Sequence, residues 1–304
     1  MELKSAQKKV SVVVVAFGSE SLRQVGRFLA SLELQTYPDL ELVLVDNSRS
    51  RELREFVDKA RARSRLDITY IASDNTGYAG GNVIGVRYAR GELVLILNPD
   101  AWLENDAIEM FRREFDRCPS NIMILVPKIL IRDSDVINSV GMRRMRGSGN
   151  LYTNVGYLEH DRGQYDEPRR VEAFDGTAFI FRIGLLAHTF LFDPRFFFGH
   201  ETTDLAERVD KLGFEIWTCP SAVVRHEVRG TVPASKNDML NILLVRNALV
   251  HTLRNKGWSM FWRTLLVAIC YGNIVKPLRR KDYRRAITYA RGVLQFILDL
   301  GIFA

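Results

Sequence analysis

The stretch ELVLILNPD, residues 92–100, decides the fold. Its five consecutive apolar residues, Leu93 to Leu97, predict a strand that is buried on both faces. The strand should stop before Pro99, because proline cannot donate to a β-ladder. Asp100 would then lie at the carboxyl end of a buried strand, which is where open α/β sheets bind ligands. A carboxylate there could hold a divalent cation and, through it, a diphosphate. The alternative is that Asp100 only caps a helix in the following residues, WLENDAIEMFRREF.

The residues before this stretch predict strands alternating with helices. Apolar runs at 10–16, 41–45 and 67–72 predict three strands, and Ser19 could cap a helix that continues to about Leu34. Strands that are separated by single helices pair in parallel. The loops FGS, DNS and NPD, which follow three of these strands, should therefore converge on one rim of the sheet. The glycine stretch 77–82 is a weak signal alone, since a tight turn before a helix would also explain it.

Composition limits the class of protein. The chain has 304 residues, of which 47% are hydrophobic, so it can form one large domain or two small ones. Its three cysteines have no metal-like spacing and are odd in number, which indicates a reducing, cytoplasmic compartment. The charged N-terminus does not resemble a signal peptide, and no apolar run reaches the roughly 18 residues of a transmembrane helix.

The positive charge of the chain is concentrated in one segment. Residues 276–291 hold seven basic residues and one acidic residue, so they carry six of the seven net positive charges. Such a patch suits anionic lipid or nucleic acid. We do not expect a nucleic-acid binder, because the chain has no recognised motif and no aromatic interleaving.

Several segments in order carry a family resemblance: VSVVVVAFGS, LELVLVDNS, NTGYAGGN and GELVLILNPD, then FDGTAFIFR and the stretch from Phe192 to His226. Over about residues 10–256 the chain resembles the family 2 inverting glycosyltransferases, and within them the rhamnosyltransferase-like branch. The resemblance implies the GT-A fold, an α/β, Rossmann-like mixed sheet flanked by helices. It also implies a catalytic domain at 1–236, with a nucleotide-binding half to about residue 100 and an acceptor half from 101. Residues 237–304 would form a helical extension.

The resemblance also implies roles for particular residues. Asp46 would lie against the nucleotide base, and Asp100 would hold Mg²⁺ or Mn²⁺ together with His226. Glu201 would be the general base that deprotonates the acceptor hydroxyl. The remaining residues that would border the nucleotide and the donor sugar are Ala16, Phe17, Ser19, Asn75, Gly80, Gly81, Asn82, Asn98 and Pro99. Those expected on the acceptor side are Asp175, Gly176 and His200.

Two departures from the family pattern leave alternatives open. The family often has an acidic or polar residue at the position of Asn98, so one carboxylate would carry the metal, which would bind weakly without the donor. Where the family usually has two adjacent acidic residues, this chain has Glu201 and Thr202, so the second acid is missing. Asp204 and Asp175 therefore remain alternative candidates for the general base. Asp204 with Arg208, and Glu207 with Lys211, could equally be ion pairs on a helix surface. A catalytically weak homologue that acts as a membrane-associated scaffold is the alternative to an enzyme.

The C-terminal residues differ in character from the rest of the chain. Residues 237–256 predict a helix that packs on the catalytic domain. Residues 258–304 combine tryptophans with the basic segment, which favours a peripheral contact with the cytoplasmic face of a membrane; a homodimer interface is the competing interpretation. The expected substrates are a dTDP- or UDP-linked sugar and a glycan or lipid-linked acceptor.

Overall fold

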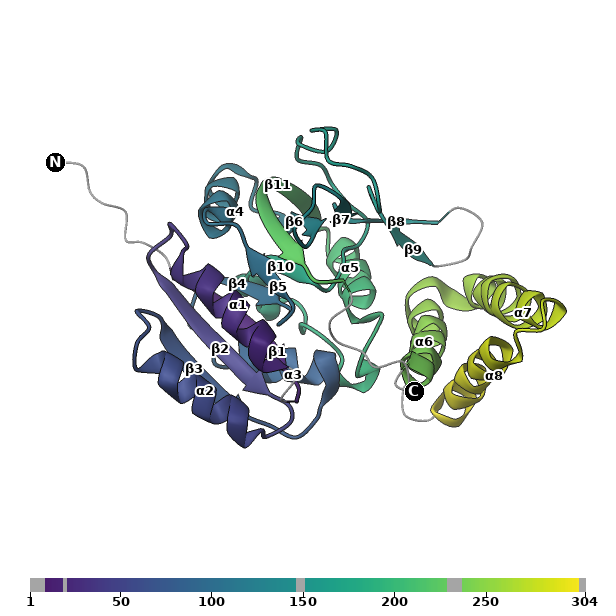
Figure 1. Cartoon of the computed structure of the whole chain (residues 1–304). Coiled ribbons are helices and arrows are strands. Elements are labelled where there is room, and N and C mark those ends of the chain that lie inside the picture. Colours follow the sequence, from purple (N-terminus) through teal and green to yellow (C-terminus); the bar gives the residue numbers. More distant parts are fainter. Residues whose placement is uncertain (1–8, 19–20, 146–150, 229–236, 301–304) are drawn as a thin grey trace.

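A computed structural model describes residues 9–18, 21–145, 151–228 and 237–300. Within these residues it shows a mixed sheet of nine strands, in the order β3-β2-β1-β4-β10-β6-β11-β5, with β7 paired to β6 (Figure 1). The strands of this sheet are β1 (Val10–Ala16), β2 (Leu40–Asp46), β3 (Asp67–Ala72), β4 (Leu93–Leu97), β5 (Ala101–Leu103), β6 (Ile122–Ile131), β7 (Ile137–Ser139), β10 (Ala178–Arg182) and β11 (Glu215–His226). A separate hairpin consists of β8 (Met142–Arg144) and β9 (Tyr152–Asn154).

The helices alternate with the strands in the first half of the chain. They are α1 (Ser21–Glu33), α2 (Arg51–Arg61), α3 (Gly77–Val86) and α4 (Ala107–Arg117), followed in the second half by α5 (Glu201–Lys211) and the short 3₁₀ turns η1 (Ile183–Ala187) and η2 (Pro194–Phe196). Strands β1 to β4 pair in parallel, as the sequence predicts, whereas β10 runs antiparallel to β4 and makes the sheet mixed.

The predicted strands agree closely with the observed ones. Three have the predicted bounds, and β2 is one residue longer at each end than the predicted 41–45. The expectation that a helix follows Asp100 directly is wrong. Trp102 and Leu103 pair with β11 as strand β5, and α4 begins only at Ala107, so Asp100 does not cap it.

Both faces of the sheet are buried, which explains the continuous apolar runs. Alternate strand residues point to opposite faces. Val12 and Leu95 pack with α1, α2 and α4 on one face, whereas Val13 and Ile96 pack with α3 and α5 on the other. The sheet is thus covered by helices on both sides, and its strand ends are left to form a site.

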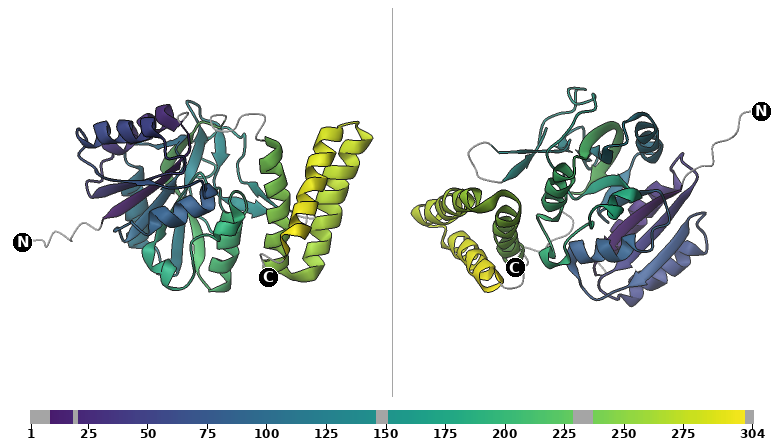
Figure 2. Two further views of the ribbon diagram at one scale, coloured as in Figure 1. Left: turned by 90° about the horizontal axis from the view of Figure 1, so that it is seen from below. Right: turned by 180° about the vertical axis from the view of Figure 1, so that it is seen from behind.

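The C-terminal helices pack beside this sheet. They are α6 (Asn237–Arg263), the π-type helix η3 (Thr264–Val275), α7 (Lys276–Arg279) and α8 (Tyr283–Leu298). Figures 1 and 2 show them on one side of the sheet, with α6 nearest to α5. The chain bends inside α6 at Gly257, whose φ of 76° and ψ of −179° suit only glycine. None of the helices in the described part of the chain combines the length and the hydrophobicity needed to span a bilayer.

Candidate active site

Asp100 and His226 lie together because two strand ends meet. Strand β11 runs antiparallel to β5 and places His226 opposite Ala101, next to Asp100. Nε2 of His226 is 3.5 Å from Oδ1 of Asp100, and both side chains are largely buried. Residues that are far apart in the sequence thus meet at the rim where β4 ends, as the resemblance implies.

The chemistry of this pair fits a divalent cation. Burial opposes a positive charge on His226, but the hydrogen bond and charge of Asp100 outweigh it and raise the pKa of His226. Nδ1 of His226 is buried and has no hydrogen-bond partner. A carboxylate and an imidazole are two ligands that Mg²⁺ or Mn²⁺ accepts. Because the described residues hold no cluster of three or more such groups, an ion here would need further oxygen ligands from a diphosphate and water.

Glu201 lies at the first position of α5 and is almost fully buried. Burial raises the pKa of its carboxyl group to about 7, although the backbone amides of Gly199 and Glu201 favour the ionised form. Its Oε2 atom is buried without a hydrogen-bond partner. A carboxyl group with a pKa near neutrality and one uncommitted oxygen has the properties of a general base.

Asp175 connects the Glu201 region with the Asp100–His226 pair. Besides the larger effect of burial, the charge of Asp175 contributes to the raised pKa of Glu201, and it also favours the charged form of His226. The two regions therefore share one electrostatic environment. Asp175 itself accepts hydrogen bonds from the amide of Thr177 at 2.8 Å and from Nδ2 of Asn154 at 3.3 Å, so both of its carboxylate oxygens already have a partner.

Tyr78 is a site residue that the sequence did not reveal. Its hydroxyl donates a 2.6 Å hydrogen bond to the carbonyl oxygen of Gly176 and so joins α3 to the acceptor-side segment. Burial, followed by the charges of Glu201 and Asp175, raises its pKa well above the usual value. In the sequence, the only feature that associates Tyr78 with the site is its position inside the glycine stretch.

The loop before Glu201 has an unusual backbone. Phe197, Gly199 and His200 all have positive φ, at 58°, 86° and 69°. For the two residues with side chains, such a conformation is costly unless the surroundings fix it. The partly buried imidazole of His200 stacks on that of His251, with ring centroids 5.8 Å apart, and desolvation lowers its pKa to about 3, so this ring is neutral.

Asn247 of α6 holds this loop in place. Its fully buried side-chain amide donates hydrogen bonds to the carbonyl oxygens of Phe196, Phe198 and Gly199, at 2.8, 2.9 and 2.9 Å. Leu244, from the same helix, touches Gly199 so closely that a Cβ atom there would lie 2.4 Å from its Cδ2. The sequence gives one signal for this role, the polar pair Arg246-Asn247 between the apolar runs ILLV and ALV.

The other acidic residues of α5 are already paired. Asp204 binds Arg208 at 2.9 Å, as predicted, but it is buried, because α6 covers it and Asn255 also donates to it. The predicted pairing of Glu207 with Lys211 is wrong. Glu207 binds Arg144 and Lys256, which reach it from other elements, and Lys211 donates to Asn255 instead.

On the side where the nucleotide is expected, the carboxylate of Asp46 is engaged by the loop that follows β2 and by Tyr70 of β3. It accepts hydrogen bonds from the amide and the hydroxyl of Ser48, from the amide of Ser50 and from the hydroxyl of Tyr70, at 2.6–2.8 Å. Asp46 thereby shapes the loop after β2. Phe17 follows the buried Ala16 at the end of β1, and its side chain is 47% exposed, as a wall for a base would be. Ser19 lies outside the described residues.

The glycine stretch has a packing role. A Cβ atom at Gly81 would lie 2.6 Å from Val15, so this glycine lets α3 pack closely on β1. A Cβ atom at Gly80 would lie 2.6 Å from the side chain of Thr76, which directly precedes α3. Asn75 is exposed and accepts from the amide of Gly77, whereas Asn82 is buried and its Oδ1 has no partner. The backbone amide of Asn98 donates a hydrogen bond to the carbonyl oxygen of Thr177, and the partly buried Pro99 follows.

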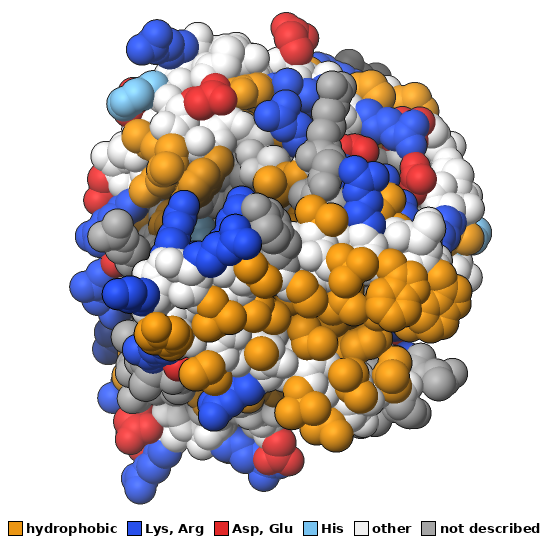
Figure 3. Space-filling model, turned by 90° about the vertical axis from the view of Figure 1, so that its right-hand side faces the viewer, with side chains coloured by type: hydrophobic (Ala, Val, Ile, Leu, Met, Phe, Trp, Pro, Cys, Tyr) orange, Lys and Arg blue, Asp and Glu red, His pale blue; other side chains and the backbone are white. Residues whose placement is uncertain are grey.

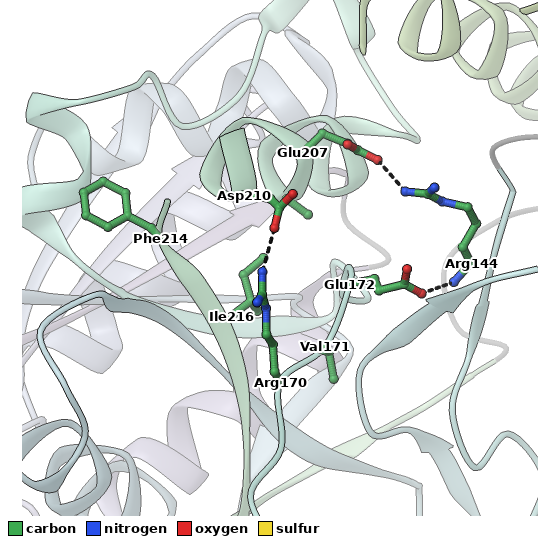
Figure 4. Close-up of a pocket in the computed structure, with 9 residues that line it drawn as sticks. Arg144, Arg170, Val171, Glu172, Glu207, Asp210, Phe214 and Ile216 are labelled. Carbon is green, nitrogen blue, oxygen red and sulfur yellow. Dashed lines mark hydrogen bonds and ion pairs between the residues drawn. The ribbon is translucent and has the colours of Figure 1, made fainter. Parts of the chain in front are cut away.

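A pocket of about 370 Å³, with charged and apolar side chains in its lining, lies further along α5 (Figure 4). Its charged side chains pair with one another, Arg144 with Glu207 and Arg170 with Asp210. Since Glu207 and Asp210 follow Glu201 by six and nine residues, the pocket lies roughly 9–14 Å along the helix from it. It contains none of the candidate site residues.

Known proteins match this chain in sequence and fold. The hexosyltransferase Agl10 of low-salt glycan biosynthesis in Haloferax volcanii is 29% identical over 59% of this chain and 56% of its own. The poly(ribitol-phosphate) β-N-acetylglucosaminyltransferase TarS of Staphylococcus aureus is 24% identical over 40% of this chain and 21% of its own. The chain thus spans about half or less of the length of these curated relatives.

Two solved structures show the same arrangement of strands and helices. GalNAc-T7 with UDP, GalNAc and Mn²⁺ gives a TM-score of 0.64 at 18% identity, over 97% of this chain and 57% of that one. The mannosyltransferase PcManGT from Pyrobaculum calidifontis, in complex with GDP-Man and Mn²⁺, gives a TM-score of 0.59 at 15% identity, over 97% of this chain and 88% of that one. These likenesses confirm the expected GT-A fold. The model of the family described as "Glycosyl transferase family 2" matches residues 11–182, more than half of the chain, so the protein belongs to this family.

Proposed function

We propose that the chain is a metal-dependent, inverting glycosyltransferase that moves a hexose or deoxyhexose, such as rhamnose, from a nucleotide diphosphate to a hydroxyl group. The state of Glu201 supports this proposal most directly. Its carboxyl group is buried, its pKa lies near 7, and one of its oxygens has no hydrogen-bond partner. In inverting transfer such a group takes the proton of the acceptor hydroxyl while the nucleotide leaves from the opposite face of the sugar.

We propose that Asp100 and His226 bind the donor diphosphate through Mg²⁺ or Mn²⁺. The bound ion would neutralise the charge of the leaving diphosphate. Asp100 is buried just after β4, the largely buried His226 lies at the end of β11, and the two side chains approach to 3.5 Å, so they need little rearrangement to share a ligand. The structural neighbours that were solved with Mn²⁺ and a nucleotide lend this assignment support.

On the nucleotide side, we propose that the rim of β1 and β2 holds the base and ribose of a dTDP- or UDP-linked sugar. Phe17 offers an exposed ring, and the loop that Asp46 shapes offers its backbone. Asn75, Asn82 and the backbone at Gly80 and Gly81 would border the sugar. The unpartnered Oδ1 of Asn82 supports this placement, since a buried amide oxygen usually accepts a hydrogen bond.

The acceptor side would consist of Asp175, Gly176 and His200, beside the base. The neutral ring of His200 would form a wall of the site. We assign residues 1–236 to the catalytic unit, with its nucleotide-binding half to about 100, and residues 237–304 to a helical extension that supports the loop before Glu201. The acceptor we favour is a glycan or lipid-linked hydroxyl at the cytoplasmic face of a membrane.

The competing proposal is an inactive homologue that serves as a scaffold, because Thr202 replaces the second acid of the family pair. Against it stands the environment of Glu201, in which burial raises the pKa of the carboxyl group to about 7. A screen of nucleotide sugars for donor hydrolysis, with Mn²⁺ and without it, separates the two proposals. An active enzyme hydrolyses at least one donor slowly, and Glu201→Gln and Asp100→Ala should each suppress that reaction. If no donor is hydrolysed and none binds, the scaffold is the better account.

A further inference from the structure

We propose that the C-terminal helices carry a docking surface for a membrane that contains anionic lipids. The surface, here called the C-terminal face, consists of an apolar part and a basic part. The apolar part includes Trp258, Trp262, Leu266, Ile287, Leu294 and Leu298, and the basic part consists of the exposed Lys and Arg side chains between 276 and 285. The inference goes beyond glycosyl transfer and does not depend on the donor or base assignments.

Packing of the helices on one another leaves each of these apolar side chains more than half exposed, although Trp258 and Trp262 also touch the core ring of Phe261. The helices already share a core, in which Phe261, Ile269 and Phe296 are at most 6% exposed. Beside this core, Trp258 and Leu298 remain 63% and 67% exposed. A helix that is apolar on a second, exposed side usually has a further partner.

The exposed apolar residues form stripes along the two long helices. Trp258, Trp262 and Leu266 follow one another at intervals of four, and Ile287, Leu294 and Leu298 recur at helical spacing along α8, so each set lies on one side of its helix. Figure 3 shows hydrophobic side chains gathered into one broad area on this side of the molecule, with lysine and arginine side chains around part of its border.

The basic residues lie on and around α7, which connects η3 to α8. Around α7 the chain exposes four cationic side chains within six residues, and Asp282 is the acidic residue next to them; the four are Lys276, Arg279, Arg280 and Lys281. Farther along, Arg284 forms an ion pair with Asp238 at 3.0 Å. A basic cluster beside an apolar stripe matches the two layers of a bilayer surface, anionic headgroups and the boundary of the acyl chains.

The charge also distinguishes a membrane from a second copy of the chain. In a two-fold symmetric dimer the same patch meets itself across the axis. Such a dimer on the C-terminal face would place two segments that each carry six net positive charges at one interface. Their like charges oppose association, whereas anionic lipid attracts each segment. The two tryptophans agree with this choice, because their indole rings favour the interface of a membrane.

The test is co-sedimentation of the full chain with vesicles of phosphatidylcholine and phosphatidylglycerol, compared with phosphatidylcholine alone. We expect binding to the anionic vesicles that weakens as salt rises, because charges are screened over about 8 Å at physiological ionic strength. Each basic residue near an anionic surface contributes roughly fivefold to partitioning. The triple variant Lys276→Glu, Arg280→Glu and Lys281→Glu should therefore lower the partition coefficient by about 100-fold or more.

Two matched controls show whether the effect belongs to this face. Reversing three exposed charges on and after α2, Arg51→Glu, Lys59→Glu and Arg63→Glu, makes the same change in net charge and should have much less effect. Leu294→Gln with Leu298→Gln should reduce binding, whereas Leu34→Gln with Leu212→Gln, also at exposed leucines, should not. Circular dichroism and donor hydrolysis without lipid check that the variants fold.

Three results would overturn the proposal. The first is a wild-type chain that does not pellet with anionic vesicles even at low salt. The second is equal pelleting of the charge-reversed and control variants. The third is a wild-type dimer in light scattering that the leucine variant converts to monomer, since the face would then be an interface between copies. Because the readout is sedimentation, failure here leaves the glycosyl-transfer proposal untouched, and the reverse also holds.

Discussion

Nδ2 of Asn247 lies 2.9 Å from the carbonyl oxygen of Gly199, two residues before Glu201. Through this bond a helix near the C-terminus holds the loop that positions the proposed base. The family match ends at residue 182, well before either residue. The loop contains left-handed residues whose conformation would relax without such support. We infer that α6 is a structural part of the active site.

Replacing Asn247 should therefore affect catalysis more than donor binding. Asn247→Leu removes hydrogen bonds to three buried carbonyl groups, which costs about 1–3 kcal/mol of stability. We expect kcat to fall by roughly 10–100-fold while the KM for the donor changes little, as for a residue that positions a base. As the loop opens, water should reach Glu201, and the acidic limb of the kcat profile should move below pH 7.

Thr252→Val is the control for Asn247. Thr252 lies buried in the same helix, and its hydroxyl donates to Ala248 within the helix and not to the loop. This variant should lose stability without a change in the pH profile. If Asn247→Leu behaves in the same way, Asn247 is only a core residue.

The raised pKa of Glu201 also predicts how stability depends on pH. Its folded pKa of about 7 lies above the ordinary value of 4.5, so the folded state binds its proton more tightly than the unfolded state. The stabilisation from this group is present below the unfolded pKa and is lost as pH rises through 7. A shift of this size corresponds to about 3 kcal/mol. Glu201→Gln should therefore stabilise the protein relative to wild type at pH 8 and hardly at pH 4, measured by denaturant unfolding without donor. An equal effect at both pH values would contradict the assigned pKa.

Asp100 is the carboxylate of the proposed metal pair. Asp100→Ala should abolish Mn²⁺-dependent binding of the nucleoside diphosphate in calorimetry, because His226 alone cannot hold the ion. Asp106→Ala is the matched control, since Asp106 is exposed a few residues further on and its side chain makes no capping bond to α4. Unchanged affinity in Asp100→Ala would mean that the diphosphate binds elsewhere or without the ion.

Tyr78 should contribute to stability through its bond to Gly176. Tyr78→Phe removes the hydroxyl and leaves a partly buried carbonyl oxygen without this donor, at a cost of about 1 kcal/mol. The urea midpoint should fall, whereas Tyr88→Phe, at a ring that is 53% exposed, should leave it unchanged. Equal midpoints for the two variants would show that the bond adds nothing.

The sequence predicted those parts of the fold that local pattern determines. Apolar runs marked β1, β3 and β4 at their observed bounds, since strands buried on both faces need continuous apolar residues. The three-residue strand β5 was missed, because Ala101–Leu103 becomes a strand only by pairing with β11. The same pairing brings His226 to Asp100, a contact that only the family resemblance had implied.

Long-range contacts also explain what was missed in the site. Asp204 was correctly paired with Arg208 at helical spacing, but its burial depends on α6. Glu207 was wrongly paired with Lys211, because Arg144 and Lys256 approach it from elements distant in sequence. No local pattern specifies such contacts.

The central claim is that Glu201 deprotonates the acceptor, and the pH dependence of transfer by wild type and Glu201→Gln tests it most directly. With an identified donor and acceptor, kcat of the wild type should rise with pH through about 7, because only the ionised carboxylate accepts the proton. Glu201→Gln should transfer ~10²–10⁴-fold more slowly and lose this dependence, while its affinity for the donor stays unchanged. Asp175→Asn and Asp204→Asn should keep the pH dependence of the wild type. If either of them abolishes transfer while Glu201→Gln retains it, Glu201 is not the base.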